Sequence, residues 1–170
     1  KIKLIGDKSL SKRDFSRVTI PLKKFGARFS SNNKLPLHIK GLKYPKPINY
    51  FENKGSAQVK TSLIMAALKT KGLSKIKAKK SRTHTEIMLK NLKVPINIKK
   101  TKNFDYIQVK GVNKISPLYY NIPGDISSSA FFLVLTILSK NSELLIKNIN
   151  INPSRTGIIE ILKRMGANIK

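Results

Sequence analysis

The chain has 170 residues, 40% of them hydrophobic, which is enough for one ordinary domain or two small ones with a buried core. It has no cysteine, which excludes disulfides, thiolate metal sites and cysteine nucleophiles, and with only two histidines we expect no metal site. Lysine and arginine total 35 against 8 acidic residues, a net charge of +27.

Hydrophobic patterns divide the chain into alternating strands and helices. In its first part we expect, in chain order, strand 2–5, a polar loop, helix 14–25 loosened by Pro21, strands 27–30 and 35–40, strand 48–51 and helix 56–69. In the second part we expect strand 74–79, helix 83–92, strands 96–99 and 106–110, helix 130–138, strand 144–149 and helix 158–165.

Two of these helices carry additional signals. Thr83 and Glu86 have the spacing of a capping box, in which each side chain bonds the other residue's backbone NH. Helix 130–138 is apolar nearly all round, so we expect it to be buried. It is also the longest apolar run and about half the length needed to cross a bilayer, so we expect no membrane segment. The absence of cysteine is compatible with a reducing cytoplasm, where we expect the protein to be located.

A small polar loop, Ser56-Ala57-Gln58, stands at the start of helix 56–69. The unpaired NH groups and positive dipole end of a helix start favour a phosphate or carboxylate. The side chains of Ser56 and Gln58 add hydrogen-bond donors. The alternative is that Ser56 only caps the helix.

Three similar segments recur about 70 residues apart. They are PLKKFGARF at Pro21, MLKNLKVPI at Met88 and ILKRMGANI at Ile161. A complete unit reads strand, polar loop, helix, strand, basic loop, helix and strand pair. The sequence therefore predicts an α/β (α+β) fold of repeated units, with the latter part of one unit followed by two more.

An arginine recurs in the basic loop of each unit, at Arg13, Arg82 and Arg155. Each precedes a predicted helix, and the guanidinium fork can hold two anionic oxygens at once. The recurrence indicates anion recognition, with a surface arginine as the alternative at each position.

The positive charge raises the alternative of a basic nucleic-acid-binding protein. Of the 35 basic residues, however, 6 are arginine and the other 29 are lysines spread along the whole chain. Isoleucine and asparagine are also abundant, which is typical of a general compositional bias. Base-stacking aromatics are not interleaved with the basic runs, so we expect no specific nucleic-acid partner.

Five segments of the chain resemble, in the same order, the middle of the EPSP synthase (3-phosphoshikimate 1-carboxyvinyltransferase) family. They are GDKSLSKRDFSRV, GSAQVKTSLIMAAL, SRTHTEIML, IPGDISSSAFF and NPSRTGIIEILKRMGA. The resemblance implies two similar domains of three βαβαββ units each, with sheets packed on a helix core and the substrates held between the domains. Residues 1–121 would be the latter part of the first domain, and residues 122–170 the start of the second.

The resemblance also implies a reaction and its site. The family transfers the enolpyruvyl group of phosphoenolpyruvate to the 5-hydroxyl of shikimate 3-phosphate, in the shikimate pathway of aromatic amino acid biosynthesis, without metal or organic cofactor. Arg13 would bind phosphoenolpyruvate, and Asp125 and Arg155 are further candidates whose alternative is a structural or hinge role. The residues that would bind shikimate 3-phosphate are Ser56, Ala57, Gln58, Ser81, Arg82 and His84.

The segments that carry catalysis in this family are absent from the sequence. We therefore expect an internal fragment that holds no catalytic residue and is inactive alone, although the full-length enzyme would be a monomer. Apolar residues such as Phe131 and Leu135 would lack partners, which predicts self-association. The rival within the same fold is the enolpyruvyl transferase acting on UDP-N-acetylglucosamine, against which the SAQ and SRTHTE segments argue.

Overall fold

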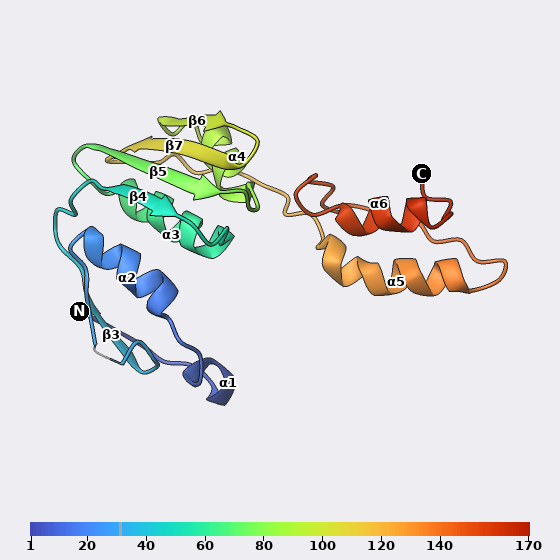
Figure 1. Cartoon of the computed structure of the whole chain (residues 1–170), viewed down its shortest axis with the longest axis horizontal. Helices are drawn as coiled ribbons and strands as arrows, with labels where there is room; N and C mark the ends of the chain where they lie inside the picture. Colours follow the sequence, from blue (N-terminus) through green and yellow to red (C-terminus); the bar gives the residue numbers. More distant parts are fainter. Residues whose placement is uncertain (31) are drawn as a thin grey trace. The chain divides into compact units, whose positions relative to one another are not determined.

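The computed structural model describes residues 1–30 and 32–170 and divides the chain into two units, each described by itself (Figure 1). Unit 1 (Lys1–Pro117) contains β1 (Ile2–Leu4), α1 (Lys8–Ser11), α2 (Ser16–Lys24), β2 (Arg28–Phe29), β3 (Leu37–Lys40), β4 (Asn49–Glu52), α3 (Ala57–Ala67), β5 (Leu73–Lys79), α4 (His84–Asn91), β6 (Ile96–Lys100) and β7 (Phe104–Lys110). Unit 2 (Leu118–Lys170) contains α5 (Ile126–Leu138) and α6 (Gly157–Arg164). None of the described helices is long and apolar enough to span a bilayer.

A four-stranded sheet with the order β4-β5-β7-β6 forms the centre of unit 1. β4 and β5 are parallel, as the helical crossover through α3 requires, and the other neighbours are antiparallel. The succession β4-α3-β5-α4-β6-β7 is one complete βαβαββ unit, which confirms the predicted fold class and repeat. In β7 the buried residues Asp105, Ile107 and Val109 alternate with exposed ones, so only one face of the sheet is covered.

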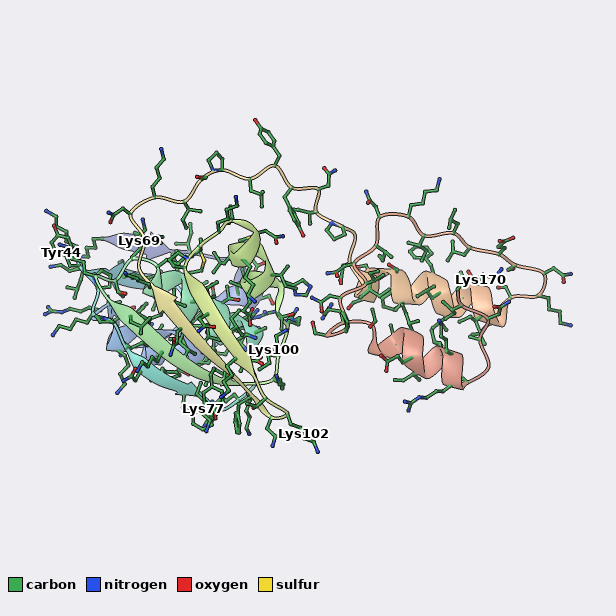
Figure 2. All side chains as sticks on the ribbon, turned by 90° about the horizontal axis from the view of Figure 1, so that it is seen from above. Tyr44, Lys69, Lys77, Lys100, Lys102 and Lys170 are labelled. Atoms are coloured by element: carbon green, nitrogen blue, oxygen red, sulfur yellow. The ribbon has the colours of Figure 1, made fainter. Side chains whose placement is uncertain are left out.

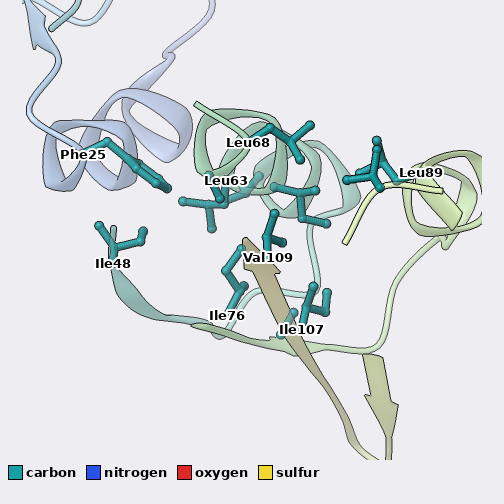
Figure 3. Packing of buried hydrophobic residues seen from close by; sticks show 13 residues of the cluster. Phe25, Ile48, Leu63, Leu68, Ile76, Leu89, Ile107 and Val109 are labelled. Atoms are coloured by element: carbon teal, nitrogen blue, oxygen red, sulfur yellow. The ribbon is translucent and has the colours of Figure 1, made fainter. Parts of the chain in front are cut away.

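Helix α3 lies on the covered face and contributes more residues to the core than any other element (Figure 3). Its residues Leu63, Ile64 and Ala67 are fully buried, each with 0% exposure. The cluster also includes Phe25 from the end of α2, Ile48 before β4, Ile76 and Ala78 of β5, Leu89 of α4, and Ile107 and Val109 of β7. Because the buried side of α3 packs into this core, the position of the loop at its start is well defined.

The first part of unit 1 corresponds to the latter part of a repeat unit, as predicted. β1, β3 and β2 form an antiparallel sheet in that order, and α2 packs beside α3 (Figure 1). Pro21 is buried within α2, which stays helical on both sides of it. The predicted polar loop before α2 contains the short helix α1, which the sequence prediction missed and which Asp7 caps by accepting from Leu10 N at 2.7 Å.

The predicted strand 144–149 is wrong. Only Ile149 is paired, in an isolated parallel bridge with Gly124, where Gly124 N donates to Asn148 O at 2.6 Å and Asn150 N donates to Gly124 O at 2.9 Å. A strand needs a paired neighbour along its length, and the described residues of unit 2 provide none beyond this bridge.

The predicted burial of the apolar helix is also wrong. α5 forms, but Phe131, Leu135 and Leu138 are 80%, 63% and 78% exposed. Unit 2 holds two described helices and no described sheet, so most of the apolar surface of α5 is left uncovered. This agrees with the expectation that Phe131 and Leu135 lack partners, whereas self-association itself remains a prediction.

Candidate functional site

The loop between β4 and α3 is shaped by its own hydrogen bonds. The carboxylate of Glu52, at the end of β4, accepts from Lys54 N at 3.0 Å and Gly55 N at 2.9 Å. Gly55 has a φ of +68°, a conformation that glycine adopts without strain. Ser56 is the N-cap of α3, and its Oγ accepts from Val59 N at 3.4 Å. Ser56 therefore does cap the helix, as the alternative interpretation expected. This cap uses the NH group of Val59, and the NH groups of Ala57 and Gln58 remain at the helix start.

The loop between β5 and α4 carries the second set of candidates. Ser81 is half-buried, and its Oγ is shielded from solvent without a hydrogen-bond partner among the described residues. Arg82 is exposed, and His84 is the first residue of α4. A buried hydroxyl without a partner is unfavourable unless a ligand or water satisfies it. The loop therefore offers one unused polar atom and one exposed cation.

The predicted capping box at the start of α4 is wrong. Thr83 occupies the N-cap position, but its side chain makes no capping hydrogen bond. Glu86 is buried and its Oε1 lies 2.6 Å from Lys60 Nζ of α3, so its carboxylate turns towards the neighbouring helix. The charge of Lys60 provides a stronger partner for a buried carboxylate than a backbone NH.

The two candidate loops lie beside each other in unit 1. A side chain at Gly55 would approach Lys80 O, next to Ser81, to 3.2 Å. Thr61 Oγ1 of α3 and Thr85 Oγ1 of α4 are 2.6 Å apart and share a hydrogen bond. The structure thus brings together the starts of α3 and α4, which carry the candidates Ser56, Ala57, Gln58, Ser81, Arg82 and His84.

Gln58 has a partner that the sequence analysis missed. Arg17, on α2, donates from its Nη2 to Gln58 Oε1 at 2.7 Å. With the carbonyl oxygen engaged, the amide NH₂ of Gln58 remains as a donor, and the exposed guanidinium adds positive charge beside the α3 start. Arg17 lies 41 residues before Gln58 in the sequence, so no local pattern could indicate this contact.

Arg13 is exposed and follows Lys12, the C-cap residue of α1. Its backbone NH donates to Leu10 O at 3.0 Å. Among the described residues, no hydrogen bond or ion pair joins its side chain to the other candidates. The guanidinium is therefore exposed to solvent and is not part of the paired loops.

Asp125 and Arg155 contact each other in unit 2. Asp125 is the N-cap of α5, accepting from Ser127 N at 3.2 Å, and its Oδ1 lies 3.0 Å from Arg155 Nη2. Arg155 also donates to Ser127 Oγ. These contacts tie the loop before α6 to the start of α5, which favours the structural alternative for both residues.

These contacts predict that the Asp125 carboxyl has a lowered pKa. The hydrogen bond from Ser127 NH, and then the contacts with Arg155, hold the pKa of the carboxyl below its ordinary value of 3.8. Because the folded pKa is lowered, the stabilisation that Asp125 gives is complete above 3.8 and is lost as the pH falls through the folded pKa. An NMR titration of the Ser127 amide should show a midpoint below 3.8, and replacing Arg155→Met should move it upwards. A wild-type midpoint at or above 3.8 would contradict the contacts.

The sequence analysis also missed a charged cluster close to the two loops, in which Lys60, Glu86 and Asp105 are buried and Lys80 is exposed. Lys60 Nζ lies 2.6 Å from Glu86 Oε1 and 4.0 Å from Asp105 Oδ2, and Lys80 Nζ lies 2.5 Å from Asp105 Oδ1. One signal was present in the sequence, since Lys60 shares the buried face of α3 with Ile64. Within the described part of the chain, no group of three or more metal-binding side chains gathers.

Comparisons with known proteins agree on one family. The family model described as EPSP synthase (3-phosphoshikimate 1-carboxyvinyltransferase) matches residues 1–170. The 3-phosphoshikimate 1-carboxyvinyltransferase of Caldicellulosiruptor bescii is 48% identical over 172 residues, 98% of this chain and 39% of the relative. That of Streptococcus agalactiae is 42% identical over 173 residues, 99% of this chain and 40% of the relative.

A solved structure gives the same result. The EPSP synthase from Acinetobacter baumannii superimposes with a TM-score of 0.81 and 35% identity, over 98% of this chain and 37% of that one. The chain thus spans about two fifths of the length of the relatives that it matches.

Proposed function

The chain belongs to the EPSP synthase family, and from this we propose that its complete protein transfers the enolpyruvyl group of phosphoenolpyruvate to the 5-hydroxyl of shikimate 3-phosphate. The product of this step leads to the aromatic amino acids, and the protein acts in the cytoplasm as a monomer. Residues 1–121 belong to the shikimate 3-phosphate-binding domain, and residues 122–170 begin the second domain.

The observation that carries the proposal is the pairing of two polar loops at neighbouring helix starts. Three kinds of donor gather there: the NH groups at the α3 start, the unpartnered Oγ of Ser81 and the exposed guanidinium of Arg82. A phosphate has oxygens that accept several hydrogen bonds at once, and helix starts and arginine favour such an anion. Arg13 supplies a separate cation for phosphoenolpyruvate.

Offsetting charge is central to this reaction, because both substrates are anions that repel each other. Positively charged groups that reduce this repulsion allow the reacting carbon and oxygen to approach. In this chain Arg82, Arg13 and the Arg17–Gln58 pair serve substrate binding, and the chain by itself does not turn over the substrates.

A titration of the 170-residue chain with shikimate 3-phosphate tests the proposal. We expect the amide NMR signals of Ser56, Gln58 and Arg82 to shift with a saturable curve at submillimolar to millimolar ligand, while the Ser127 amide of unit 2 stays unchanged. Replacing Arg82→Gln should weaken binding about tenfold, because a charged hydrogen bond to phosphate is lost.

Two controls give the titration its specificity. Shikimate without the phosphate should bind more weakly than shikimate 3-phosphate, and UDP-N-acetylglucosamine should leave the three amide signals unchanged. Unchanged signals with millimolar shikimate 3-phosphate would contradict a site at the paired loops.

The nucleic-acid alternative finds less support. Basic side chains lie on several sides of unit 1, with Lys69 far from Lys77 and Lys102 (Figure 2). The ammonium of Lys77 lies 4.9 Å from the ring centre of Phe51 and 4.3 Å from that of Phe104, so a cation already contacts two aromatic rings on which bases could stack. Salt-dependent binding of single-stranded nucleic acid at submicromolar concentration would support the nucleic-acid-binding alternative.

A further inference from the structure

Two side-chain contacts join α3 and α4 within a few residues of the candidate loops. Lys60 and Thr61 lie in the first turns of α3, and their partners Glu86 and Thr85 lie in the first turn of α4. The contacts are the Lys60–Glu86 ion pair and the Thr61–Thr85 hydrogen bond, both at 2.6 Å. We call these two pairs the α3–α4 contacts.

Stability alone does not explain the buried Lys60–Glu86 ion pair. The side chains of Lys60 and Glu86 are 0% and 4% exposed, and removing two charges from water is costly. Neither Lys60 Nζ nor either carboxylate oxygen of Glu86 has a well-aligned hydrogen bond among the described residues. Apolar residues of similar volume at such positions often stabilise a fold equally well or better, so the pair suggests a requirement for a defined geometry.

The location of the contacts indicates what that geometry serves. The Ser56 and Ser81 loops contribute donors from two different helix starts, and a ligand bound by both requires a fixed separation between them. A displacement of about 1 Å in a binding arrangement can weaken it strongly. The Thr61–Thr85 hydrogen bond fixes the separation directly. The buried ion pair fixes it from the preceding residue on α3 and the following residue on α4.

We propose that Lys60, Thr61, Thr85 and Glu86 are positioning residues that hold the two anion-binding loops at the separation required by shikimate 3-phosphate. This inference rests on the proposed function and extends it to residues that do not touch the ligand. Because the two loops are already held at a fixed separation, they lose less conformational freedom when the ligand binds, and this strengthens binding.

The first test replaces both threonines with valine, Thr61→Val with Thr85→Val. Removing both hydroxyls leaves no unpaired partner, so the melting temperature should stay close to that of the wild-type chain. Shikimate 3-phosphate should nevertheless bind about tenfold more weakly by the NMR titration, because the loops are no longer held together. The matched control is Ser62→Ala. Among the described residues, the Ser62 hydroxyl bonds only to Val59 O of its own helix, at 2.8 Å, so its loss should leave binding unchanged.

The second test asks whether the two loops act as a unit. In the wild-type chain, the binding losses of Gln58→Ala and Arg82→Ala should be non-additive, because each loop needs the other in place. In the double-valine background the two losses should become additive. A merely structural role of the threonines would not change this additivity.

The third test replaces the ion pair with apolar residues, Lys60→Met with Glu86→Leu. We expect a folded protein that binds shikimate 3-phosphate more weakly than the wild-type chain. Wild-type-like binding in both double variants would overturn this inference while the proposed function stood. Failure of the wild-type chain to bind would overturn the proposed function, and this inference with it.

Discussion

Replacing Lys60→Met alone is expected to lower the free energy of unfolding of unit 1 by about 3–5 kcal/mol, the cost of leaving a buried charge without its partner. Lys60 is fully buried, and its ammonium is the nearest cation to the carboxylate of Glu86 among the described ion pairs. Asp105 keeps its contact with Lys80, so most of the loss comes from Glu86. Urea denaturation followed by circular dichroism measures the change.

Two further variants define the cause of this loss. Lys69→Met makes the same substitution at an exposed position just after α3 and should change the stability by less than about 0.5 kcal/mol. Adding Glu86→Leu to Lys60→Met removes the unpaired carboxylate and should restore most of the lost stability. If the double variant is as unstable as the single one, packing around the lysine stem and not the unpaired charge determines the loss.

The regular elements of unit 1 could be predicted because their signals are local. The hydrophobic pattern of residues 56–69 indicated α3, and the structure confirms the helix with Ser56 at its N-cap. The period of about 70 residues predicted the βαβαββ unit, since each repeated segment has the same hydrophobic pattern at the same place.

The side-chain contacts across unit 1 could not be predicted, because they join residues distant in sequence. Lys60 meets carboxylates at positions 86 and 105, and Arg17 meets Gln58 across 41 residues. The Thr83–Glu86 capping box failed for the same reason, since the local spacing gave no sign that Lys60 would attract the carboxylate. The sequence thus indicated where the candidate loops begin but not what holds them together.

In unit 2 the error is the opposite one, because local patterns predicted a strand and a buried helix face that its described residues do not form. The pattern at 144–149 is typical of a strand, but a strand needs neighbours, and in the described part of the chain Ile149 pairs with Gly124 alone. The apolar residues of α5 likewise need a surface to cover them, and Phe131 is 80% exposed. Hydrophobic periodicity indicates which face should be buried, and the remaining elements decide whether it is.

Replacing Leu63→Ala is the second substitution for which we expect a large effect, a loss of about 2–5 kcal/mol in the free energy of unfolding of unit 1. Leu63 is 0% exposed and belongs to the cluster that α3 shares with the central sheet and with Phe25, the C-cap residue of α2 (Figure 3). The substitution removes buried methyl groups and leaves a cavity that close-packed neighbours fill only in part. Urea denaturation measures the loss.

Met65→Ala is the matched control, since Met65 lies two residues further along α3 and is 47% exposed, so its loss should stay below about 1 kcal/mol. Equal losses for the two variants would contradict the packing described for α3. The comparison also bears on the candidate site, because α3 carries Ser56 and Gln58 at its start while Leu63 anchors its middle. If the core sets the position of that start, Leu63→Ala should weaken shikimate 3-phosphate binding under conditions where the protein is still folded, whereas Met65→Ala should not.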